Sequence, residues 1–182
     1  LKGQWEQDRW SWSNTSRHNA SVLKAIGQRM ATIELDADTI EQEKKKGWNF
    51  QPRNGWSEPA QLEASLAAKI GAQIHAVSRS MPKYGESIVG TIGGMQVILQ
   101  RYDGLVVVIQ SRDGVVKYTP NRTGVHINMY AESGSMVLEK IEDLIDEPAR
   151  QIKLAQRLED ENRDIAGRLQ QGFDHQEKLE QL

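Results

Sequence analysis

The stretch SIVGTIGGMQVILQRYDGLVVVIQSRDGVVKYTP, residues 87–120, constrains the fold more than any other part of the chain. Its apolar runs are rich in β-branched residues, and Gly-Gly or Asp-Gly pairs separate them at short, regular intervals. Such pairs accept the positive φ angles that tight turns between strands require. The stretch therefore predicts an antiparallel meander with strands at 89–92, 95–99, 105–109 and 115–118, and a fifth strand near 125–129.

The glycine cluster of Gly90, Gly93 and Gly94 also raises the question of a phosphate-binding loop. Such a loop needs glycines between a strand and a helix, so that backbone N–H groups and the helix N-terminus meet the anion. Here the glycines lie between two expected strands, and no Lys-Ser or Lys-Thr pair follows them. The cluster therefore predicts a turn, and we expect no nucleotide cofactor.

Two helical repeats bracket this sheet in the sequence. In residues 21–47, apolar or small side chains alternate at spacings of three and four, and they are Leu23, Ile26, Met30, Ile33, Ala37 and Ile40. In residues 134–182 the same spacing recurs at Ala155, Leu158, Asn162, Ile165 and Leu169. This spacing is typical of paired helices, and one polar residue such as Asn162 can fix their register. We expect the two regions to pair as an antiparallel stalk.

Local signals divide the rest of the chain. Gly47 should end the first helix after its lysine run, and Asn54-Gly55 predicts a hairpin flanked by Trp48 and Trp56. Ser57 should cap a following helix with Pro59 in its first turn. The buried side of that helix is expected at Leu62, Leu66, Ile70 and Ile74. Gly172 should close the long C-terminal helix, and Asp174 with Glu177 resembles a capping box that opens another.

The expected organisation is an α+β fold in four parts. They are a tryptophan-rich segment at 1–20, a heptad helix at 21–47, a hairpin, helix and antiparallel sheet at 48–133, and the C-terminal helices at 134–182. The first part carries Trp5, Trp10 and Trp12. Their indoles either pack against the domain or a neighbour, or form a platform on which nucleic-acid bases stack.

The composition excludes several classes of protein. The formal net charge is -2, so no global attraction to nucleic acid or membrane exists, although a local basic patch is not excluded. The chain has no cysteine, which fits a reducing compartment, and it has no apolar run of the ~20 residues that a membrane span needs. We therefore expect a cytoplasmic location. We also expect the chain to be a piece of a longer protein, because it begins with Leu1 rather than Met.

No group of residues in the sequence predicts catalysis. The four histidines, His18, His75, His126 and His175, lack the spacing of metal ligands, and no nucleophile elbow is present. Acidic pairs fall on expected helix surfaces and are typical of solvated faces. We therefore expect no metal, no cofactor and no enzymatic activity in this chain.

Two groups of basic residues are candidates for contact with DNA phosphates. Arg150, Lys153 and Arg157 share one face of an expected helix, and Arg79 and Lys83 flank Pro82 in the loop before the sheet. Each group is either ordinary surface charge or a contact with a DNA backbone. Acidic residues from Glu159 onward weaken the field of the first group.

Three landmarks in order carry a resemblance to a known family. They are VGTIGGMQVIL with Gly90 and Gly94, GSMVLEKIEDLI beginning at Gly134, and LQQGFDHQEKLEQL with Phe173. Together they resemble the C-terminal region of large helicase–DNA methyltransferase proteins of phages, plasmids and other bacterial mobile elements. The helicase part of those proteins is of the strawberry-notch-like superfamily 2 kind. The resemblance covers roughly residues 21–182 and includes WNFQPRNGWSEPAQLEASLAAKI.

The catalytic motifs of that family are not in this chain. Helicase action needs a phosphate loop and a second ATP motif, and the methyltransferase needs an Asn-Pro-Pro-aromatic site, whereas here Pro120-Asn121 is reversed. The resemblance therefore implies a non-catalytic accessory module that positions DNA or links the catalytic domains of a larger protein. The alternative is a coiled-coil assembly or adaptor module that self-associates and has no nucleic-acid role.

Overall fold

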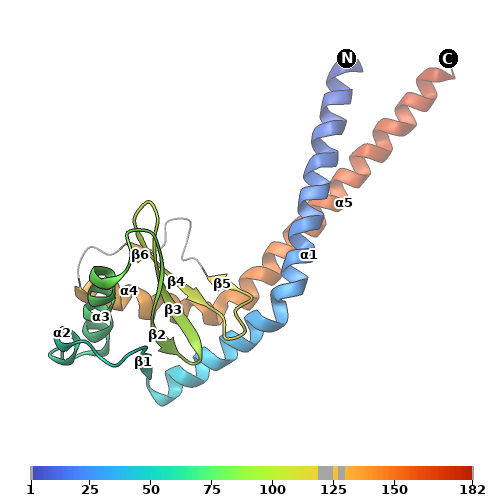
Figure 1. The fold of residues 1–182 in the computed structure, drawn as a ribbon. Helices are drawn as coiled ribbons and strands as arrows, with labels where there is room; N and C mark the ends of the chain where they lie inside the picture. Colours follow the sequence, from blue (N-terminus) through green and yellow to red (C-terminus); the bar gives the residue numbers. More distant parts are fainter. Residues whose placement is uncertain (1, 119–124, 127–129, 182) are drawn as a thin grey trace. The chain divides into compact units, whose positions relative to one another are not determined.

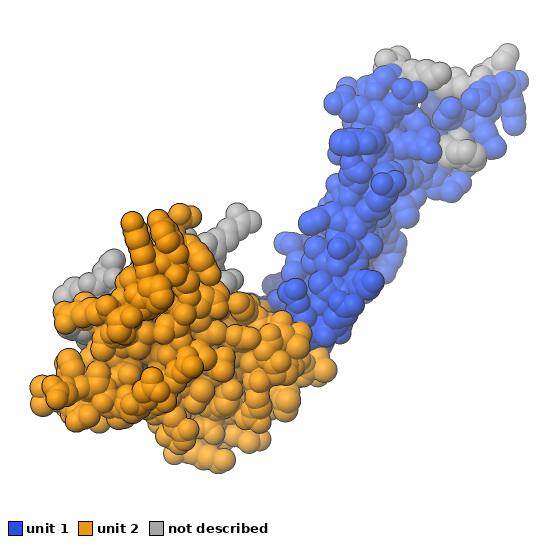
Figure 2. All heavy atoms as spheres, in the orientation of Figure 1, with its two compact units in different colours: residues 1–30, 149–182 blue, residues 31–148 orange. Residues whose placement is uncertain are grey.

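The computed structural model describes residues 2–118, 125–126 and 130–181, and it divides into two compact units. Unit 1 comprises residues 1–30 and 149–182, and unit 2 comprises residues 31–148 (Figure 2). Helices and an antiparallel sheet together make up the chain (Figure 1), so the expected α+β class is confirmed. The expected four-part division differs from these units, because unit 1 combines the two ends of the chain.

The helices and strands follow one another in a simple order. They are α1 (Lys2–Lys46), β1 (Phe50–Pro52), α2 (Glu58–Gln61), α3 (Leu66–Ser80), β2 (Gly85–Ile92), β3 (Met95–Arg101), β4 (Leu105–Gln110), β5 (Lys117–Tyr118), β6 (Val125–His126), α4 (Tyr130–Asp143), the 3₁₀ helix η2 (Leu144–Asp146) and α5 (Glu147–Glu180). Helix α1 ends where Gly47 adopts a φ of 83°, as expected.

The sheet of unit 2 is the meander that the sequence predicts. Its strand order is β1-β2-β3-β4-β5, and every pair is antiparallel. Strand β6 also pairs with β4, at residues 106–107, whereas β5 pairs with β4 at residues 109–110. Gly93 and Gly94 turn the chain between β2 and β3 with φ angles of 57° and 81°. The predicted fifth strand is present as Val125–His126, and its remaining residues, 127–129, lie outside the described part of the chain.

The core of unit 2 lies between one face of the sheet and three helices. Alternate residues of β3 and β4 point into it because side chains along a strand alternate between faces. The buried residues from the sheet and from α1, α3 and α4 include Val97, Leu99, Val107, Ile109, Ile33, Ile40, Ile70, Ile74, Val137 and Ile141. The second half of the heptad seam on α1 is thus part of this core rather than of a stalk.

Helices α3 and α4 approach each other more closely than side chains would allow. A β-carbon built on Gly134 would lie 1.6 Å from the carbonyl oxygen of Ala67 and 3.0 Å from the backbone nitrogen of Gly71. Both neighbours are backbone atoms, which cannot move aside as a side chain can. Glycine at position 134 is therefore a requirement of this packing.

Unit 1 is an antiparallel pair made of the first part of α1 and most of α5. Trp5 lies against Gly172, the Arg168 guanidinium lies 5.9 Å from the Trp12 ring, and Asn19 hydrogen bonds to Asn162. These contacts run in opposite directions along the two helices, and the N and C labels of Figure 1 mark the same end of the pair. Ile26, Leu158 and Ile165 are buried in the seam.

The polar pair in this seam defines its register. The Asn19 Nδ2 group donates to Asn162 Oδ1 at 3.1 Å, and Asn162 Nδ2 donates to the Ser16 carbonyl oxygen at 3.3 Å. A shift of either helix by one heptad would leave these amides without each other, because apolar residues such as Ile26 and Leu169 occupy the equivalent positions seven residues away. This agrees with the sequence-based role of Asn162 and supplies its partner.

Both ends of the chain are more helical than expected. Helix α1 begins at Lys2, so the tryptophan-rich segment is its first part and not a separate region. Helix α5 continues through Gly172 to Glu180, so neither the expected end at Gly172 nor a new helix at Asp174 is present. Gly172 is explained by its contact with the Trp5 indole.

The segment around Asn54-Gly55 also differs from the expected hairpin. Gly55 has the positive φ of a turn, but Phe50–Pro52 pairs with β2 instead of with the residues after the turn. Ser57 forms no capping bond with its side chain, and its backbone N–H donates to buried Gln73. Pairing with β2 makes this segment the edge strand of a larger sheet. Such pairing stabilises the folded chain more than an isolated two-stranded hairpin would.

The helix expected after Ser57 is interrupted. Helix α2 ends at Gln61, and α3 begins after Ser65, whose hydroxyl accepts a hydrogen bond from the Ala68 N–H. Leu62, expected on the buried side, is 87% exposed because it lies in the break. Leu66 is half-buried, and Ile70 and Ile74 are in the core, as predicted.

We predict that Gly134→Ala destabilises unit 2. The added methyl group overlaps backbone atoms of α3, and such overpacking costs about 1–3 kcal/mol, more than the ~1 kcal/mol by which alanine favours a helix. Chemical unfolding monitored by circular dichroism would measure the difference. Gly104→Ala is the control, since no atom lies within 4 Å of its added methyl. Equal stability of the two variants would contradict the close helix approach.

A matched pair of glycines on α5 tests the packing of unit 1. A β-carbon on Gly172 would lie 2.5 Å from Trp5 Nε1, whereas one on Gly167 meets nothing within 4 Å. We predict that Gly167→Ala stabilises the helix pair by about 0.5–1 kcal/mol, through helix propensity alone. Gly172→Ala should lose this gain and shift the Trp5 fluorescence. If thermal unfolding showed the same increase in stability for both variants, the result would argue against contact between Trp5 and Gly172.

Candidate functional site

A cluster of polar side chains in unit 2 joins α1 to β5 and to the turn between β4 and β5. The Tyr118 hydroxyl donates to Asp36 Oδ2 at 2.6 Å, and the Thr32 hydroxyl donates to Asp113 Oδ2 at 2.7 Å. Asp113 also accepts from the Ser111 hydroxyl at 2.6 Å and from the Val115 N–H at 2.9 Å. The Asp36 carboxylate on α1 and the Asp113 carboxylate in the turn are thus each held by hydroxyl donors.

Asp36 and Tyr118 have unusual protonation properties. Asp36 is 3% exposed and Tyr118 is 8% exposed. Burial is the main cause that raises the pKa of Asp36 above its ordinary value, and the hydrogen bond from Tyr118 partly offsets it. Burial and the neighbouring Asp36 carboxylate also raise the pKa of Tyr118 far above its ordinary value, so its hydroxyl stays a donor.

Asp113 shows the opposite shift. Hydrogen bonds from Ser111 and Thr32 lower the pKa of this exposed carboxyl, so it is ionised in the folded protein near neutral pH. Its bonds shape the β4–β5 turn and attach it to α1. Because the Asp36 and Tyr118 groups satisfy each other in the interior, this pair acts as a structural connection, and Asp113 is the carboxylate of the cluster that is exposed to solvent.

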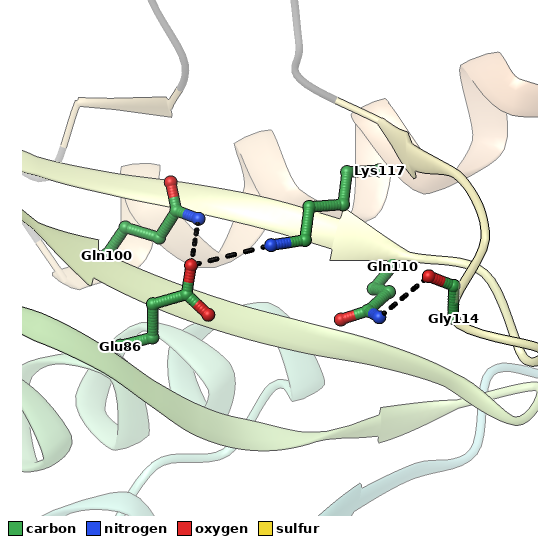
Figure 3. A network of polar contacts seen from close by, with 5 residues as sticks. All are labelled: Glu86, Gln100, Gln110, Gly114 and Lys117. Carbon is green, nitrogen blue, oxygen red and sulfur yellow. Dashed lines mark hydrogen bonds and ion pairs between the residues drawn. The ribbon is translucent and has the colours of Figure 1, made fainter.

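A second polar group lies on the face of the sheet opposite the helices. Figure 3 shows Gln100, from the adjacent strand β3, and Lys117, from β5, directed toward Glu86 of β2. Glu86 Oε1 accepts from Gln100 Nε2 at 2.6 Å and pairs with Lys117 Nζ at 3.5 Å. The carboxylate charge is therefore compensated by groups of the same sheet, and this group stabilises cross-strand pairing.

The predicted DNA-contact residues fall in both units. Arg79 is in the last turn of α3, and Lys83 lies in the following loop with its ammonium 5.8 Å from the ring of Tyr84, which is 64% exposed. Arg150, Lys153 and Arg157 are exposed in the first turns of α5. The first group therefore belongs to unit 2 and the second to unit 1, and each presents its charge to solvent.

The tryptophans divide into two kinds. Trp5 and Trp12 are half-buried in the seam of unit 1, where Arg9 lies 5.5 Å from the Trp5 ring and Arg168 lies near Trp12. Trp10 is 69% exposed. The signal that would have placed them is the seven-residue spacing of Trp5, Trp12, Asn19 and Ile26, which extends the seam predicted for residues 21–47. Packing thus explains two of the three.

Comparisons with known proteins add no family assignment. No protein-family model matches the sequence, and no significant match was found among curated proteins or solved structures. Among the described residues, no group of three or more histidine, cysteine or acidic side chains could hold a metal ion. Within the same part of the chain, no helix has the length and apolar character needed to cross a membrane.

The buried Asp36 predicts a pH-dependent effect of Asp36→Asn. The folded pKa lies above the unfolded value of 3.8, so the unfolded state releases the proton first as pH rises. The wild type should therefore lose stability relative to the Asn variant from about pH 3.8 up to the folded pKa. Urea unfolding at pH 3, 5 and 7 would measure this difference, and a constant difference would contradict burial of the carboxyl.

Proposed function

We propose that this chain is a non-catalytic accessory module of a large DNA-processing protein, of the helicase–methyltransferase kind that its landmark motifs resemble. In this proposal the module positions DNA or links catalytic domains. The observation that carries it is the helix pair of unit 1, which is held in one register by Asn19 and Asn162 and exposes basic side chains.

A register-fixed antiparallel pair suits a positioning role. Its two helices bracket unit 2 in the sequence, and Trp5 near the start of α1 contacts Gly172 in the last part of α5. A helix also holds exposed cations at fixed spacings, which suits contact with a phosphate backbone.

Glycines of two of the landmark motifs have packing roles in this fold. A β-carbon on Gly90 would lie 2.5 Å from the Gln51 carbonyl oxygen and the Phe50 ring, and Gly134 is required by the α3–α4 packing. Gly94 lies under the Arg112 side chain, which also donates to the Gly93 carbonyl oxygen. Motifs of this kind specify close packing, which is what an accessory domain would share with its relatives.

The basic face of α5 provides the test of the DNA role. We predict that Lys153→Glu with Arg157→Glu weakens binding to duplex DNA at low salt by about tenfold or more. If both side chains contact phosphates, the slope of log affinity against log salt should fall by about 1.8. Fluorescence anisotropy with labelled DNA at several salt concentrations would measure both quantities.

The control carries the same change in charge at another place on α5. Arg163→Glu with Lys178→Glu reverses two exposed cations of the same helix, and Arg163 already pairs with Asp160 at 3.3 Å. Equal loss of binding in both double variants would indicate a nonspecific charge effect and would remove the Lys153–Arg157 face from the proposal.

The alternative function, a coiled-coil assembly module without a nucleic-acid role, draws on the long seven-residue repeat of α1. In this structure α5 of the same chain fills the first part of that seam. Absence of DNA binding at low salt, together with a mass that rises with concentration in sedimentation experiments, would favour the alternative.

A further inference from the structure

The first part of α1 contains a long segment without acidic residues. No Asp or Glu occurs from Arg9 to Ile33, while Arg17, Lys24 and Arg29 add positive charge along the segment. At 1.5 Å per residue, the segment is roughly 37 Å long. Unit 1 is thus unevenly charged, because seven of its nine acidic residues belong to α5.

The side of this segment that faces away from α5 carries a regular row. Trp10, Arg17 and Lys24 repeat every seven residues, each two positions before a seam residue. Two residues rotate a helix by about 200°, so this row lies opposite the seam formed by Trp12, Asn19 and Ile26. All three side chains of the row are exposed, and Trp10 is 69% exposed. We call Trp10, Arg17 and Lys24 the outer row.

The two cations of the outer row form no ion pairs with other described residues. Arg17 and Lys24 have no ion-pair partner there, whereas Arg163 and Arg168 pair with Asp160 and Asp164 on α5. Arg9, by contrast, lies over the Trp5 ring at 5.5 Å and belongs to the seam side. Glu159 and Glu161 are on the other helix, so the outer row keeps its positive field.

We infer that the outer row is a contact surface for single-stranded DNA. Trp10 offers an open aromatic face on which one unpaired base can stack, and Arg17 and Lys24 meet phosphates on the same side of the helix. Duplex DNA offers no such base, because its bases already stack on each other. Polar side chains between these residues, Asn14 and Ser21, add hydrogen-bonding groups. This inference rests on the proposed DNA role. It adds that the DNA is single-stranded and that the outer row contacts it.

The test compares variants of the outer row in the whole chain. Trp10→Ala should weaken binding to a labelled oligothymidine about fivefold to hundredfold while changing duplex binding little, because only an unpaired base stacks on the indole. Arg17→Gln with Lys24→Gln should lower the salt slope for the same oligonucleotide by about 1.4. All substituted side chains are exposed, so circular dichroism should show unchanged folding.

Matched controls separate location from residue type. Tyr102→Ala removes an aromatic side chain that is 56% exposed in unit 2, and Arg163→Gln with Lys178→Gln removes two cations from α5. These controls should bind the oligothymidine like the wild type. Equal weakening by the controls and the outer-row variants would overturn the inference.

The outcomes also distinguish this inference from the proposed function. If the wild type binds DNA and only the Lys153–Arg157 variant weakens it, the DNA role stands and the outer row is overturned as its surface. Preference for duplex with no effect of Trp10→Ala overturns the single-strand assignment. If the wild type binds neither form at low salt, the DNA role itself fails.

Discussion

One seven-residue repeat along α1 is the constraint on which both units depend. Trp5, Trp12, Asn19 and Ile26 belong to the helix pair of unit 1, and Ile33 and Ile40, at the same spacing, are buried in the core of unit 2. The spacing keeps these side chains on one side of a continuous helix. A single stripe therefore packs against α5 in its first part and contributes to the sheet core in its second.

Polar groups in these interfaces specify position. The Asn19–Asn162 bond fixes the register of the helix pair, and the Asp36–Tyr118 bond fixes α1 against the sheet of unit 2. Burying such groups is costly unless each finds its partner, so alternative packings that separate them are disfavoured. Apolar packing alone would tolerate a shift by a turn far more easily. The polar contacts therefore contribute uniqueness to an interface that hydrophobic burial stabilises.

The glycines that first suggested a phosphate site have a structural explanation. Gly93 and Gly94 form the β2–β3 turn, and Gly90 allows β1 and the Phe50 ring to approach β2. Gly134 does the same between two helices. The glycines of the first two landmarks behind the resemblance are thus positions where a β-carbon would collide or where φ is positive, and their roles are structural. Function in this proposal lies instead on exposed helix surfaces, where a sequence pattern places few constraints.

The sequence by itself determined the strands of the meander after residue 85, most helices and several turns, because periods of two and of three to four residues and glycine-containing turns are local properties. It also identified Asn162 as a seam residue. Only the tertiary structure decided that Asn19 is its partner, that Phe50–Pro52 joins β2, that Leu62 is exposed and that Asp36 is buried with Tyr118. These features depend on contacts between residues far apart in the chain. Burial stabilises such contacts only after the distant segments have packed together, so no local sequence pattern specifies them.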